Sequence, residues 1–122
     1  MKPDHVELFK DLVIFSLDQF ASVLKIKLED YRNNSSFKDS KPIVHKENIT
    51  VMEEEVVYVG SAKKFLEEMD TGSYKDVKLF KDELLEKIYE HNRSHAAPGV
   101  IDVILKEKLE NCWSFYQKMS GK

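Results

Sequence analysis

The sequence predicts a mainly α protein, an antiparallel helical bundle of about four helices in a single domain that spans residues 1–122. Three observations lead to this prediction. Apolar residues recur every three or four positions along much of the chain, helix-capping residues precede these stretches, and turn residues separate them. A chain of 122 residues is long enough for one core, since a domain of this size buries roughly two thirds of its unfolded surface.

The strongest helical pattern covers residues 4 to about 30. Its apolar side chains follow one another at steps of three and four, which places them on one helical face. They are Phe9, Val13, Leu17, Phe20, Leu24, Leu28 and Tyr31. Leu8, Leu12 and Phe15 widen this face, so the helix is expected to lie at the centre of the core. An alternative ends the helix sooner and makes a strand of the alternating residues 24–28.

The segment that follows is harder to interpret. Residues 32–48 have the composition of a flexible loop, with asparagine, serine and proline at several positions. Residues 49–59 contain valines, which prefer strands, but Glu53, Glu54 and Glu55 interrupt them. Two interpretations stay open for this segment: a small β hairpin that turns at the acidic residues, or a helix. If the segment is a genuine sheet, the fold is α+β.

The rest of the chain predicts three more helices. Ser61 can cap a short helix that ends at the turn residues 70–72. Ser73 and Asp76 form a capping box for a helix over residues 74 to about 91, whose inner face contains Val77, Phe80, Leu84 and Ile88. After a loop at residues 91–99, the inner face of the last helix contains Ile101, Leu105, Leu109, Cys112, Tyr116 and Met119.

The tetrapeptide Asp70-Thr71-Gly72-Ser73 resembles the signature of aspartic proteases, in which two close carboxylates have pKa values that are driven apart. That family is all-β, whereas amphipathic helices flank the tetrapeptide here. We therefore interpret it as a turn between two helices, in which aspartate, glycine and serine are common.

Charge and composition restrict the function classes. The chain has 19 basic and 22 acidic residues, a net charge of -3, and so no general attraction to nucleic acids or anionic lipids. No apolar run approaches the roughly 20 residues that span a membrane, and the single cysteine, Cys112, cannot form an intramolecular disulfide. We expect a cytoplasmic protein without a membrane or nucleic-acid partner, so a nucleic-acid-binding regulator ranks third among the functions.

The main candidates for catalysis or metal binding are Glu90, His91 and His95. The two histidines lie four residues apart, on one face if the helix continues, and Glu90 could add a third ligand. A tetrahedral metal site needs more converging ligands, so we expect neither a metal nor another cofactor. Cys112 occupies an apolar periodic position, which favours packing over nucleophilic chemistry. A small hydrolase or metal-dependent enzyme using Glu90, His91 and His95 is the alternative function.

The final helix carries the candidate partner-binding residues Trp113, Phe115 and Tyr116. They point in different directions around a helix, so a single core leaves at least one ring exposed unless two layers sandwich the helix. Exposed aromatic rings are typical of binding surfaces. We therefore expect a small protein-binding or regulatory module of the immunity, antitoxin or adaptor type, without catalytic activity. Its expected partner is another protein, or a second copy in a homodimer.

Overall fold

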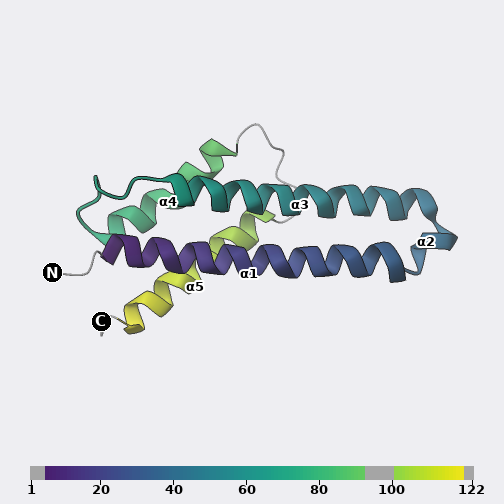
Figure 1. Cartoon of the computed structure of the whole chain (residues 1–122), viewed down its shortest axis with the longest axis horizontal. Coiled ribbons are helices and arrows are strands. Elements are labelled where there is room, and N and C mark those ends of the chain that lie inside the picture. Colours follow the sequence, from purple (N-terminus) through teal and green to yellow (C-terminus); the bar gives the residue numbers. More distant parts are fainter. Residues whose placement is uncertain (1–4, 93–100, 120–122) are drawn as a thin grey trace.

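The computed structural model describes residues 5–92 and 101–119 and confirms the mainly α prediction. These residues contain no strand and form the helices α1 (His5–Asn34), α2 (Phe37–Ser40), α3 (Pro42–Glu68), α4 (Val77–His91) and α5 (Ile101–Met119). The long helices α1 and α3 lie side by side in opposite directions and are joined through α2 (Figure 1). α4 and α5 pack near the end of this hairpin that holds the start of α1. No described helix is both long enough and apolar enough to cross a membrane.

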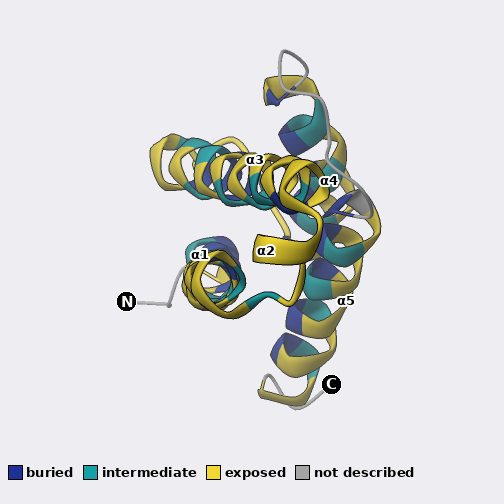
Figure 2. Cartoon of the chain, turned by 90° about the vertical axis from the view of Figure 1, so that its right-hand side faces the viewer, coloured by how far each residue is buried: buried dark blue, intermediate teal, exposed yellow. Residues whose placement is uncertain are grey.

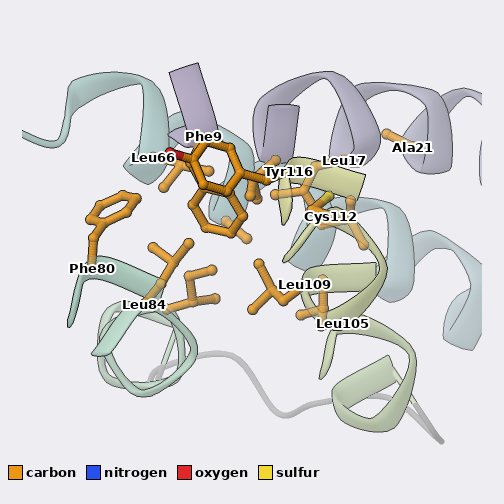
Figure 3. Close-up of a cluster of buried hydrophobic side chains, with 14 of the residues drawn as sticks. Phe9, Leu17, Ala21, Leu66, Phe80, Leu84, Leu105, Leu109, Cys112 and Tyr116 are labelled. Atoms are coloured by element: carbon orange, nitrogen blue, oxygen red, sulfur yellow. The ribbon is translucent and has the colours of Figure 1, made fainter. Parts of the chain in front are cut away.

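The core lies where the four long helices meet, around the first half of α1 (Figure 3). Phe9 is fully buried there. Its ring makes edge-to-face contacts with Phe80 of α4 and with Trp113 and Tyr116 of α5, at centroid distances of 6.1, 5.8 and 5.9 Å. Such contacts add to the stabilisation that burial itself provides, so one phenylalanine of α1 holds α4 and α5 against the hairpin.

The predicted inner faces are confirmed for most residues. All four predicted residues of α4 are buried, as are those of α5 except Met119, which is exposed. In α1, Phe9, Val13 and Leu17 are buried, whereas Phe20 and Leu24 are only half-buried. The second half of α1 runs beyond the four-helix core (Figure 1), and fewer helices cover it. The alternative strand at residues 24–28 is wrong, because this segment lies inside α1.

The β hairpin considered for residues 49–59 is also wrong, because α3 contains this whole segment. Tyr58, Val59 and Ala62 are buried at helical spacing, in the helix that packs along α1. Glu53 instead lies near the surface, where a carboxylate oxygen is 3.2 Å from the Arg32 guanidinium. Most of the stability of a helix in a protein comes from packing of one face, which here outweighs the strand preference of the valines.

Helices also occupy most of residues 32–48, where the sequence predicts a loop. α1 continues to residue 34, α2 forms a single turn, and Pro42 begins α3. Proline suits this first position, where its missing N–H removes no helical hydrogen bond. The rings of Tyr31 and His45 stack with centroids 5.0 Å apart, and the Asn48 amide donates to the Tyr31 hydroxyl at 2.7 Å. These contacts tie the end of α1 to the start of α3.

The C-terminus of α3 is capped by a lysine of α1. Lys10 is buried, with 7% exposed, and its Nζ donates to the carbonyl oxygens of Glu67 at 3.3 Å and Met69 at 2.9 Å. Carbonyls at a helix end lack partners within the helix, and a cation is favourable beside them. Nζ also lies 3.7 Å from Oε1 of Glu7, and Oε2 of the same carboxylate accepts a 2.7 Å hydrogen bond from the Thr71 hydroxyl.

The residues 70–73 form a turn between α3 and α4, as their composition indicates. The Gly72 backbone N–H donates to Oδ1 of Asp70 at 2.9 Å. Asp76, and not Ser73, caps α4, because its side chain accepts from the Leu79 backbone N–H at 2.8 Å. α4 therefore begins at residue 77, three residues later than the sequence predicts.

Ser61 lies inside α3 and does not cap a helix as predicted. Its hydroxyl donates to Oδ1 of Asn92 at 2.8 Å, and the Asn92 amide donates to the carbonyl oxygen of Tyr58 at 3.1 Å. Asn92 is almost completely buried, so the end of α4 is joined to α3 by a satisfied polar contact.

Candidate functional site

The structure separates the three candidate aromatic residues of α5. Tyr116 is buried, and its hydroxyl lies 2.9 Å from Nδ1 of His5. Trp113 is half-buried and stacks on Tyr116 with centroids 5.8 Å apart, while Nζ of Lys81 lies 5.8 Å from its ring. Phe115 is exposed at 53%. Of the three, Phe115 offers the largest free ring surface to a partner.

Phe115 lines an apolar groove between α1 and α5. The groove has a volume of about 300 Å³ and is lined by Leu12, Phe15, Ser16, Gln19, Asn111, Cys112 and Phe115. None of these side chains is charged, although charged residues make up 34% of the chain. α1 is seen nearly end on in Figure 2, and the C-terminal part of α5 extends past it. An uncharged groove between two helices is suited to apolar side chains of another molecule.

α1 carries a second stripe on the side of the helix opposite Leu17, and Leu12, Phe15 and Gln19 of this stripe form one wall of the groove. The stripe occupies positions 8, 12, 15, 19, 22 and 26, whose steps of four and three place them along one side of a helix. We call it the outer stripe, and it consists of Leu8, Leu12, Phe15, Gln19, Ser22 and Ile26. Phe15 is 62% and Ile26 69% exposed, so the described chain leaves much of the stripe uncovered.

Cys112 lines the groove and is buried, in agreement with its apolar periodic position. Burial raises the pKa of its thiol, although a hydrogen bond with Ser16 acts in the opposite direction. The sulfur lies 3.8 Å from the carbonyl oxygen of Leu12. Reactive cysteines need a lowered pKa, so the surroundings of Cys112 favour packing over nucleophilic chemistry.

Sequence reasoning missed the exposed second face of α1, because it assigned Leu8, Leu12 and Phe15 to a widened inner face. The signal that could have found the groove is the regular four-and-three spacing of the outer stripe itself. That spacing predicts a second contact surface on α1. It does not distinguish a neighbouring helix of the same chain from a second molecule.

Glu90 and His91 line a different hollow, between the end of α3 and α4. It has a volume of about 540 Å³ and is lined by Phe65, Met69, Asp70, Ser73, Tyr74, Lys87, Glu90 and His91. The His91 ring stacks on Phe65 with centroids 4.5 Å apart. His95, the third candidate, lies outside the described residues. Across residues 5–92 and 101–119, no cluster of three or more histidine, cysteine, aspartate or glutamate side chains could hold a metal ion.

Lys87 contributes a cation to this hollow. A hydrogen bond with Tyr74 raises the pKa of Lys87, and the charges of Glu83 and Glu90 act in the same direction. A lysine that remains protonated is neither a nucleophile nor a base. The hollow therefore combines one protonated lysine and an imidazole with the carboxylates of Asp70 and Glu90, a lining of mixed charge.

The chain matches no protein-family model, no curated protein and no solved structure. The function is therefore inferred from the geometry of the groove and of the hollow.

Proposed function

We propose that this protein is a small, non-catalytic protein-binding module that uses the apolar groove between α1 and α5. The observation that carries the proposal is an uncharged groove with two exposed phenylalanines, Phe15 and Phe115. Large exposed apolar patches usually mark interaction sites, and aromatic side chains dominate many interfaces. An immunity, antitoxin or adaptor protein of the cytoplasm would need such a module.

The two phenylalanines supply enough apolar surface to matter for affinity. Roughly half of each residue is exposed, which corresponds to about 100 Å² if a large aromatic side chain can bury about 200 Å². At about 25 cal/mol per Å², the burial of one exposed ring surface contributes about 2.5 kcal/mol. Loss of either ring is therefore expected to weaken binding by about 10- to 100-fold.

Site-specific photo-crosslinking tests this proposal. A photoreactive phenylalanine analogue at position 115 should capture the partner in an extract of the native host, and the same analogue at position 43 serves as the control. Ile43 of α3 is 75% exposed and does not line the groove. The affinity of the captured partner should then fall in Phe15→Ala and Phe115→Ala but not in Ile43→Ala. Equal capture at both positions, or equal affinity of all variants, would contradict the proposal.

A ligand-binding or hydrolytic role at the second hollow is the alternative, because Lys87, Glu90 and His91 line one space of about 540 Å³. Thermal-shift measurements with small phosphates and carboxylates test it. Stabilisation of the wild type by one of these anions, absent in both Lys87→Ala and His91→Ala, would favour this alternative.

A further inference from the structure

We infer that the occupant of the groove is α1 of a second copy of this chain, so that the protein forms a two-fold symmetric homodimer. The inference rests on the proposed function, because it uses the same groove, and it names the partner. It follows from the symmetry of the outer stripe, from the exposed second half of α1, and from the size of the apolar face.

The outer stripe is self-complementary when two copies of α1 run in opposite directions. Its six positions are symmetric about Leu17, since each position before this residue has a counterpart equally far after it. Antiparallel copies aligned at this point pair Leu8 with Ile26, Leu12 with Ser22, and Phe15 with Gln19 of the second copy. Each pair occurs twice, as an interface between identical surfaces requires.

The side chains of these pairs also match in size. Phe15 faces the flexible Gln19, and Leu12 faces the small Ser22, so no pair places two aromatic rings against each other. Alternation of large and small side chains allows two helices to approach closely. The four-and-three spacing of the stripe is the spacing at which two helices pack with a small crossing angle.

The second half of α1 exposes apolar side chains that a second copy would bury. Val23 and Ile26 are exposed, and this half of the helix runs beyond the four-helix core (Figure 1). Antiparallel pairing places it beside the first half of α1 in the second copy, where Leu8 and Phe115 are exposed. Each copy thus provides the apolar segment that fills the groove of the other.

The apolar face has the size that a dimer needs. Its exposed side chains are Leu8, Phe15, Val23, Ile26, Phe115 and Met119. If each exposes about 100 Å², roughly half the surface that a large aromatic residue buries, the face presents about 600 Å². A stable interface buries about 800 Å² per partner, most of its centre apolar. The face accordingly supplies most of this area, and the polar side chains around it supply the rest.

Light scattering of the full-length chain after size exclusion tests the inference. The wild type should have twice the mass of one chain. Ile26→Glu places a charge opposite Leu8 of the second copy and should halve the mass, whereas the control Ile43→Glu should leave it unchanged. Both residues are exposed in the single chain, so both variants should keep the helical circular dichroism of the wild type.

Cysteine crosslinking tests the register. Gln19→Cys places two thiols near the symmetry axis, so a short bismaleimide should link the two copies, whereas Val57→Cys, exposed on α3, should not link them. A monomeric wild type, a dimer that Ile26→Glu does not dissociate, or equal crosslinking at positions 19 and 57 would overturn the inference. A monomer that still captures another protein through position 115 overturns the dimer alone, and a monomer that captures none contradicts the proposed function as well.

Discussion

Replacement of Lys10 by methionine measures how much a buried cation stabilises the end of α3. The Lys10 ammonium donates to the carbonyl oxygens of Glu67 and Met69 at 3.3 and 2.9 Å. Methionine is similar in length and keeps the apolar contacts of the lysine stem, but it removes the charge and both hydrogen bonds. The two carbonyls would then remain near the protein interior without this donor.

The expected loss follows from three contributions. A hydrogen bond from a charged donor contributes about 1.5 to 3 kcal/mol, and a cation at a helix C-terminus about 0.3 to 1 kcal/mol when exposed and up to about 2 kcal/mol when partly buried. Burial of the methionine end recovers about 1 kcal/mol. The net loss is about 2 kcal/mol, which lowers the melting temperature of a domain of this size by roughly 8 °C.

Differential scanning calorimetry at a fixed protein concentration checks this value, because self-association would make the melting temperature depend on concentration. The matched control is Lys78→Met. The Lys78 side chain is largely exposed and lies 2.8 Å from the carboxylate of Asp82, one turn along the same helix, and exposed pairs of this kind contribute little to stability. A loss in Lys10→Met no larger than that in Lys78→Met would refute the capping role of Lys10.

Four further predictions concern the core, an ion pair, the cysteine and the metal content. Leu17→Ala should destabilise the fold by about 2 to 5 kcal/mol, because the side chain is buried, and an unchanged melting temperature would exclude it from the core. The ion pair with Lys63 lowers the pKa of Asp18. The pair therefore stabilises the fold fully at pH values above the ordinary pKa of this carboxyl, and this stabilisation is lost as the pH falls through the lowered pKa. As the pH is lowered over the acidic range, Asp18→Asn should therefore lose less stability than the wild type, most clearly at low salt. Melting temperatures that fall equally with pH in both proteins would contradict this. Cys112 should react with a thiol reagent far more slowly in the native chain than in urea, because burial raises its pKa; equal rates would place it at the surface. Elemental analysis should find no stoichiometric zinc, and one zinc per chain, lost in His91→Ala, would support the metal-dependent alternative.

The helices that the sequence predicts well are those whose apolar residues have one dominant face. In α1 the spacing identifies Phe9, Val13 and Leu17 as buried, but it does not separate them from Leu8 and Phe15, which are exposed. α4 belongs to this class, and its spacing alone indicates which of its residues are buried in the core. α3 does not, because its valines prefer strands in isolation, and its helical state depends on packing along α1. The predicted loop at residues 32–48 fails for a similar reason, since the stacking of Tyr31 on His45 joins residues whose proximity exists only in the folded hairpin.

The candidate site could be predicted only in part. The sequence indicates that Trp113, Phe115 and Tyr116 cannot all face one core, and the structure exposes Phe115 most while burying Tyr116. Which ring is buried depends on the angle at which α5 crosses α1, and no local pattern specifies that angle. The contribution of Phe15 was missed for the same reason, since its exposure depends on where α5 lies.

The extension of α1 and α3 beyond the four-helix core means that stability is unevenly distributed along the hairpin. α4 and α5 do not extend to its far end (Figure 1), and the buried Nδ1 of His45 has no hydrogen-bond partner among the described residues. Separation of the two helices at this end would return that nitrogen to water while leaving the ring contacts of Phe9 intact. Regions with few buried contacts open at a lower free energy than the whole domain. Hydrogen exchange of the amides in residues 32–48 is then governed by local opening of the hairpin end, whereas exchange of the amides around Phe9 requires global unfolding.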